Sequence, residues 1–146
     1  MNRGALWKCP ICKRPFANQN QSHSCGRYSV AEFLNGKSDR AIAIFNRFAE
    51  MIEACGPIIT APAKTRVGFQ VRMIFAAVNR LDDSGMNAHV ILARRVEHIR
   101  FTKIESISPK NHVHHFRITS IEELNQEVEG WLNEAYKVGC QEHLKK

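Results

Sequence analysis

The stretch KTRVGFQVRMIFAAV, residues 64–78, decides the fold class of this chain. Side chains from Lys64 to Arg72 alternate with the period of two that is typical of a strand with one buried face. One side carries Thr65, Val67, Phe69 and Val71, and the other carries Lys64, Arg66, Gly68, Gln70 and Arg72. An apolar run follows from Met73 to Val78. The stretch therefore predicts neighbouring strands of a sheet with one apolar and one basic face.

Helical periodicity precedes these strands. Apolar residues spaced by three and four positions predict a helix from about Arg40 to Ala54, capped by Ser38 or Asp39 and ended by Gly56 and Pro57. A short helical turn from Val30 to Leu34 is predicted after Ser29, which has a glutamate three positions later as in a capping box.

A second long helix closes the chain, predicted from Ile121 to Val138 with Ser120 and Glu123 as its capping box. Further strands are predicted at Ile58–Thr60, Asn87–Ala93 and His112–Ile118. Short connections favour antiparallel pairing, so we expect an α+β domain with an antiparallel sheet packed on one face by two main helices. The side with Val67 and Phe69 should meet the helices.

The charge of the chain is positive and unevenly distributed. The 146 residues carry a formal charge of +7, with +5 in residues 1–37, −1 in residues 38–59, +6 in residues 60–120 and −3 in residues 121–146. This distribution favours an anionic partner, first of all DNA or RNA, although a basic composition also serves solubility alone. We find no apolar run of the roughly 20 residues that a membrane helix needs and no signal-peptide core, so a cytoplasmic location is expected.

Four potential metal ligands lie close together near the N-terminus. Cys9, Cys12, His23 and Cys25 form the pattern C-x2-C-x10-H-x-C. Three thiolates and one imidazole complete a tetrahedral Zn²⁺ site, so the site should be closed and structural. The surrounding residues have too few apolar side chains to order themselves without a metal. We therefore predict a zinc-binding knuckle over residues 1–28, followed by an α+β domain over residues 29–146.

The knuckle also carries basic and aromatic side chains. Trp7, Lys8, Lys13 and Arg14 are candidates for contact with nucleic acid, because such side chains bind phosphates and stack on bases. The alternative is that Trp7 and Phe16 pack the knuckle against the larger domain or against a protein partner.

Candidate anion ligands lie in the middle of the chain. They are Lys64, Arg66, Arg72, Arg94, Arg95, His112 and His114. Alternation along the strand places His112 and His114 on one face and His115 on the other. No phosphate-binding loop, nucleophile elbow or HExxH motif occurs, and we assign no catalytic residue.

Three segments resemble a known family. Residues 61–78, residues 91–118 with the His-His strand, and residues 121–136 with the Trp-Leu-x-x-Ala-Tyr helix resemble the bacterial domain-of-unknown-function family 5655 over about residues 30–140. The resemblance implies a small α+β domain similar to the YdhG type, some members of which are described as iron chaperones. It implies no secure activity.

Three functions are compatible with these observations. The first is a non-enzymatic protein that binds nucleic acid or another anion through the knuckle and the basic sheet face. The second is an enzyme or small-anion binder that uses arginine and histidine side chains at the sheet. The third is an adaptor whose knuckle docks a protein partner. The oligomeric state is not determined by these patterns.

Overall fold

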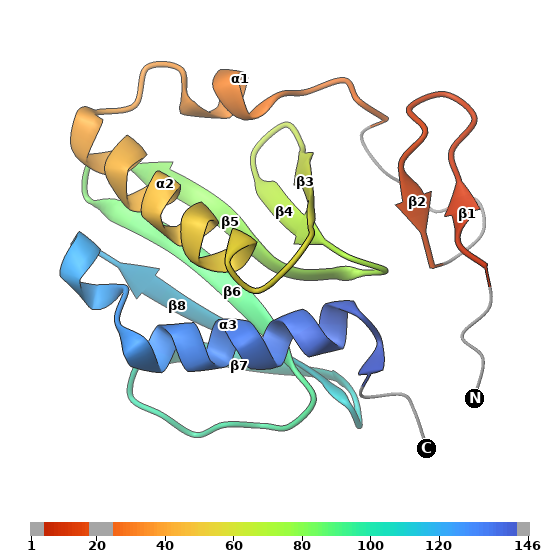
Figure 1. Cartoon of the computed structure of the whole chain (residues 1–146). Coiled ribbons are helices and arrows are strands. Elements are labelled where there is room, and N and C mark those ends of the chain that lie inside the picture. The colour runs from red at the N-terminus through yellow and green to blue at the C-terminus, as the bar shows by residue number, and fades with distance from the viewer. Residues whose placement is uncertain (1–4, 18–24, 143–146) are drawn as a thin grey trace.

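A six-stranded antiparallel sheet forms the centre of the fold, and two helices lie across one of its faces (Figure 1). The computed structural model describes residues 5–17 and 25–142. The strand order is β3-β4-β5-β6-β8-β7. The strands are β3 (Ile59–Pro62), β4 (Val67–Gln70), β5 (Ile74–Asp82), β6 (Gly85–Leu92), β7 (Phe101–Ser108) and β8 (Asn111–Ile118). The predicted α+β class with an antiparallel sheet is confirmed.

The helices follow the same chain order that the sequence predicts. They are α1 (Val30–Leu34), α2 (Asp39–Glu53), the 3-10 turn η1 (Ile121–Glu123) and α3 (Gln126–Gly139). Helices α2 and α3 contact each other and both contact β5 and β6, so they cover the same face of the sheet. A separate two-stranded hairpin, β1 (Trp7–Lys8) and β2 (Pro15–Phe16), lies at the N-terminal end.

Helix α2 forms where the sequence predicts it. The Ser38 side chain accepts a hydrogen bond from the backbone N–H of Ala41 at 3.1 Å and so caps the first turn. The buried residues of the helix recur every three or four positions: Ala41, Ile44, Phe45, Phe48, Met51 and Ile52. This stripe lies against the sheet, where Phe48 contacts the edges of Phe69 and Phe116 with ring centroids 6.0 and 6.1 Å away.

Close packing at Gly139 fixes the end of α3. The position where a Cβ atom would stand is already occupied by the ring of Phe75, which is fully buried. The carbonyl oxygen of Gly139 also accepts the backbone N–H groups of Arg72 and Met73. Helix α3 is therefore tied directly to the connection between β4 and β5.

The strand predictions need two corrections. Strand β4 covers only Val67–Gln70, because Lys64, Thr65 and Arg66 form the exposed connection from β3. Strand β7 was not predicted, and the reason is that none of its residues is fully buried. It lies at the edge of the sheet, and shifts in its pairing with β8 interrupt the simple alternation of its side chains.

Gln70 also differs from the expectation of an exposed basic row. Its side chain is 1% exposed, and its amide nitrogen donates a hydrogen bond to the carbonyl oxygen of Pro15 in the N-terminal hairpin. The prediction for the opposite side is confirmed, since Val67 and Phe69 belong to the main core. The N-terminal hairpin thus covers the predicted basic face of the sheet at Gln70.

The last helix begins later than predicted. The chain makes the 3-10 turn η1 after Ser120, and α3 starts only after Asn125, whose side chain accepts the backbone N–H groups of Glu127 and Val128. Glu123 still performs the capping function expected of it, because its carboxylate accepts the backbone N–H of Ser120 at 3.0 Å. The same carboxylate pairs with Arg100 at 2.7 Å.

These contacts make the stability of the fold depend on the charge of Glu123. Its pKa is lowered to about 2, first by the hydrogen bond from Arg100 and then by that from Thr119. A carboxyl group with a lowered pKa stabilises the fold above its ordinary pKa, and this contribution is lost as the pH falls through the folded-state value.

We therefore expect Glu123→Gln to lower the free energy of unfolding by about 1–2 kcal/mol at pH 7, with the difference from the wild type shrinking between about pH 5 and pH 2. Urea denaturation followed by circular dichroism measures both quantities. Glu122→Gln, on the exposed neighbouring residue, is the matched control. Equal stability of the two variants at pH 7 would contradict the assigned contacts.

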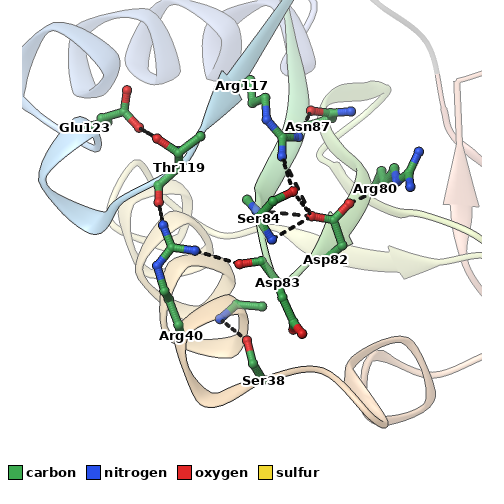
Figure 2. A network of polar contacts seen from close by, with 12 residues as sticks. Ser38, Arg40, Arg80, Asp82, Asp83, Ser84, Asn87, Arg117, Thr119 and Glu123 are labelled. Carbon is green, nitrogen blue, oxygen red and sulfur yellow. Dashed lines mark hydrogen bonds and ion pairs between the residues drawn. The ribbon is translucent and has the colours of Figure 1, made fainter.

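A polar network joins α2 to the β5–β6 turn and to the end of β8 (Figure 2). The Arg40 guanidinium donates to the carbonyl oxygens of Asp83, in the β5–β6 turn, and of Thr119, after β8. On the far side of the turn, Arg117 donates to the side chains of Asn87 at 2.6 Å and Ser84 at 2.7 Å. The turn at residues 82–85 is thus held by Arg40 from α2 and by Arg117 from β8.

Candidate metal centre and the open sheet face

Three of the four predicted ligands converge beside the N-terminal hairpin. The sulfur atoms of Cys9, Cys12 and Cys25 all lie within 4.8 Å of one another, and Cys9 and Cys25 are 3.6 Å apart. Sulfurs in a tetrahedral zinc site are about 3.8 Å apart, because each Zn–S bond is about 2.3 Å long. The three cysteines can therefore bind a metal ion. The fourth predicted ligand, His23, lies outside the described residues.

Local backbone geometry turns the first two cysteines toward each other. The backbone N–H of Lys13 donates to the carbonyl oxygen of Cys9 at 2.9 Å, and the N–H of Cys9 donates to that of Arg14 at 3.1 Å. Lys13 takes a left-handed conformation with φ of 67°, and Cys25 does the same with φ of 58°. Such strain in residues other than glycine is concentrated at functional sites, where the surroundings hold it in place.

The thiols do not ionise equally. The backbone N–H of Cys12 donates to the Cys9 sulfur, and this hydrogen bond is the main reason that the pKa of Cys9 is lowered to about 6. The hydrogen bond with Cys9 raises the pKa of Cys25 to about 11. The Cys9 thiolate thus forms readily, and its negative charge opposes the ionisation of Cys25. A bound cation removes that opposition, since it stabilises every coordinating thiolate.

Arg14 supplies positive charge next to the sulfurs. Burial lowers the pKa of its guanidinium, while the nearby Cys12 raises it. The guanidinium stacks over the ring of Phe16 at 4.4 Å, and its Nε atom is buried without a hydrogen-bond partner within the described ranges. Three thiolates, one neutral imidazole and Zn²⁺ would carry a net charge of −1, which Arg14 is placed to offset. Its contact with nucleic acid stays a prediction.

The other predicted contacts of the knuckle are partly exposed. The Trp7 ring lies 5.9 Å from the Phe16 ring and lines a shallow hollow with Ala5, Leu6 and Ala17. Lys8 and Lys13 are exposed. Phe16 is 5% exposed, so of the two aromatic residues it is the one that packs inside.

The predicted anion ligands do not form one group. Lys64 and Arg66 are exposed at the β3–β4 connection, and their side chains have no partner in residues 5–17 and 25–142. Arg72 donates to Gln141 at 2.8 Å. Arg94 pairs with Glu134 at 2.8 Å, and Arg95 pairs with Glu97. The structure therefore leaves Lys64 and Arg66 as the cations of this set best placed to meet an anion.

The two predicted histidines use both of their ring nitrogens within the fold. His114 is fully buried, shares a hydrogen bond with the carbonyl oxygen of His112 and accepts the backbone N–H of Val96. His112 contacts Ser106 at 2.8 Å and the carbonyl oxygen of Pro109 at 3.1 Å. Burial also lowers the pKa of His114, so its ring is neutral and holds the loop before β7 in place.

A different histidine pair lies on the sheet face that α2 and α3 leave uncovered, which we call the open face. His89 and His115 are direct partners on β6 and β8, and their ring centroids are 5.4 Å apart. Asn79 contacts Nδ1 of His89 at 2.8 Å, and Glu105 contacts Nε2 of His115 at 2.7 Å. Sequence reasoning placed His115 away from His112 but did not single out His89, because its partner depends on the pairing register.

One family model matches most of the chain. The family described as Domain of unknown function (DUF5655) matches residues 30–139, three quarters of the chain. The chain belongs to this family. The DUF5655 domain includes both main helices and the whole six-stranded sheet, as the sequence resemblance implies, and the match begins after Cys9, Cys12 and Cys25.

Apart from the DUF5655 match, the comparisons found no relative of the chain. No curated protein and no solved structure matches the chain. Of the helices in the described part of the chain, none is long and apolar enough to cross a membrane.

Proposed function

We propose that this protein binds nucleic acid through the surface formed by the N-terminal hairpin and the open face, without converting it chemically. The observation that carries the proposal is a set of exposed cations without carboxylate partners in the described parts of the chain: Lys8, Lys64 and Arg66. Nucleic acid is the polyanion to which such cations contribute most, because each phosphate contact releases condensed counterions.

The arrangement of these cations supports one continuous surface. Lys8 pairs across the hairpin with Pro15, whose carbonyl oxygen accepts the hydrogen bond from Gln70 on β4. Lys64 and Arg66 immediately precede β4. The hairpin thus contacts the C-terminal end of β4, Lys64 and Arg66 precede its N-terminal end, and the proposed surface runs along this strand.

The helical side of the domain is less suited to an anion. Helix α3 displays the acidic side chains of Glu127, Glu129 and Glu134 with only Lys137 in its last turn. Several other arginines are already paired with carboxylates, namely Arg47, Arg80, Arg94, Arg95 and Arg100. A phosphate backbone is therefore repelled from α3 and favoured at the hairpin and the β3–β4 connection.

The metal in this proposal is Zn²⁺, held by Cys9, Cys12, His23 and Cys25. The thiolate-rich donor set favours zinc over hard cations such as Mg²⁺. With all four positions filled by protein, the ion orders the hairpin and leaves no position for a substrate. Its contribution to binding is to hold Lys8 and Trp7 in place.

We expect binding to oligonucleotides that weakens about 20- to 40-fold between 50 and 200 mM salt, since three phosphate contacts give a logarithmic slope of about −2 to −3. Fluorescence anisotropy with labelled oligonucleotides measures this. Replacing Lys8, Lys64 and Arg66 together by alanine should abolish most of the salt dependence.

A second triple variant controls for overall charge. Lys37, Arg47 and Lys137 lie outside the proposed surface, and their replacement by alanine removes the same three charges. We expect it to bind within about threefold of the wild type. An absence of binding at 50 mM salt would overturn the function, and equal losses in both triple variants would overturn the assigned surface.

A further inference from the structure

The open face carries a row of polar side chains that runs from the β3–β4 connection across the four strands β5, β6, β8 and β7. Arg66 stands at the start of β4, directly before the buried Val67. Asn79 of β5 contacts His89 of β6, which is paired with His115 of β8. His115 is in turn the partner of Lys103 on β7. The row thus has Arg66 and Lys103 at its ends and two imidazole rings at its centre, and the carboxylate of Glu105 lies beside His115 and Lys103.

The two central histidines differ from the other histidines of the sheet. Each has one ring nitrogen bound within the fold, Nδ1 of His89 by Asn79 and Nε2 of His115 by Glu105. The remaining nitrogen of each ring has no partner among the described residues, whereas both nitrogens of His112 and His114 have one. The pair is therefore oriented by neighbours and still able to bind a ligand.

The charge of the row suits a ligand that is both anionic and planar. Burial, followed by the nearby His115 and Arg66, lowers the pKa of His89 to about 4, so this ring is neutral at pH 7. The carboxylate of Glu105 contacts Nε2 of His115 at 2.7 Å and Nζ of Lys103 at 3.6 Å. The neutral ring of His89 near the exposed Arg66 thus combines a stacking surface with a phosphate contact.

The length of the row indicates the size of the ligand. Neighbouring strands lie about 4.8 Å apart, so the row from β4 to β7 spans about 19 Å. RNA-binding modules with four-stranded sheets stack two or three bases over such a face. A single small anion would contact only one end of the row.

We propose that the open face binds single-stranded nucleic acid, with bases against the rings of His89 and His115 and phosphates at Arg66 and Lys103. The proposal rests on the function proposed above and adds the strand state and the central contacts. Single-stranded DNA and RNA share this chemistry. A duplex does not, because its bases are stacked inside and no basic helix is available on the α3 side to enter a groove.

The decisive experiment compares alanine variants of His89 and His115 with His112→Ala. Anisotropy with a 12-nucleotide oligo-dT, an oligo-U of equal length and a mixed-sequence 12-base-pair duplex should show preference for both single strands. We expect His89→Ala and His115→Ala each to weaken single-strand binding about 5- to 150-fold, the range found for one base–aromatic stack. His112→Ala, on the same strand as His115, should change it less than about twofold.

Two further measurements separate stacking from loss of structure. His115→Phe keeps an aromatic ring and should restore binding to within about fivefold of the wild type. In unmodified protein, oligo-dT should shift the imidazole NMR signals of His89 and His115 and leave those of the buried His114 in place.

The outcomes distinguish this inference from the function on which it rests. If Lys8, Lys64 and Arg66 are needed while both histidine variants bind like the wild type and no imidazole signal shifts, the central contacts are wrong and the nucleic-acid function stands. Preference for the duplex would also overturn the inference. If no oligonucleotide binds at 50 mM salt, both proposals fail.

Discussion

Replacing Cys9 by serine is expected to reduce bound zinc from about one ion per chain to nearly none. Cys9 is 3% exposed and lies within 3.6 Å of the Cys25 sulfur, so a serine hydroxyl at this position replaces the most enclosed thiolate by a poor zinc ligand. Elemental analysis of the purified, reduced protein measures the metal content.

The loss of metal should be local. None of residues 5–17 belongs to the main hydrophobic core, which joins α2 and α3 to the sheet. We therefore expect the thermal midpoint of the DUF5655 domain in the Cys9→Ser variant to stay within about 3 °C of the wild type, while NMR signals of the hairpin lose their dispersion. A chelator added to the wild type should produce the same change.

Cys55 provides the matched control for this experiment. It lies at the end of α2, where its thiol donates to the carbonyl oxygen of Met51 at 3.5 Å and burial raises its pKa. Cys55→Ser should keep its full metal content. A wild-type protein without metal, or a Cys9→Ser variant with about one zinc ion per chain, would contradict the proposed centre.

Replacing Phe48 by alanine should cause the largest loss of stability, about 3–5 kcal/mol in the free energy of unfolding. The Phe48 ring is fully buried and contacts the edges of Phe69 on β4 and Phe116 on β8. Its removal leaves a cavity between α2 and two strands that are not neighbours in the sheet, and the surrounding side chains can fill it only partly.

Chemical denaturation checks this value, and a fall of roughly 10–20 °C in the thermal midpoint should accompany it. Ile99→Ala is the control, because the Ile99 side chain is 98% exposed and its loss should cost less than about 0.5 kcal/mol. A Phe48→Ala variant that unfolds within about 1 kcal/mol of the wild type would show that α2 does not pack on the sheet as described.

The elements that could be predicted are those whose residues form a local pattern. The stripe of α2 and its cap at the helix start depend on neighbours within a few positions, and both are present. Strand β7 has no such pattern, because an edge strand buries few side chains and its pairing shifts hide the alternation. The late start of α3 depends on Asn125, a second cap that competes with Ser120.

The functional residues divide in the same way. The spacing of Cys9, Cys12 and Cys25 is a local signal that predicts their convergence, because a metal needs its ligands within a few ångströms. His89 and His115 are 26 positions apart, and only the register between β6 and β8 makes them partners. The same register pairs Val90 with His114 and buries that histidine.

The sequence by itself therefore determined the class of fold, the family and the cysteine centre, since each depends on periodicity or short spacing. Only the tertiary structure decided which charges stay unpaired and which imidazoles keep a spare nitrogen. The reason is physical: an ion pair such as Arg94–Glu134 or a cross-strand pair such as His89–His115 joins residues that the chain separates widely and folding brings together. The candidate binding surface consists of the exposed cations and imidazole nitrogens that these contacts do not use.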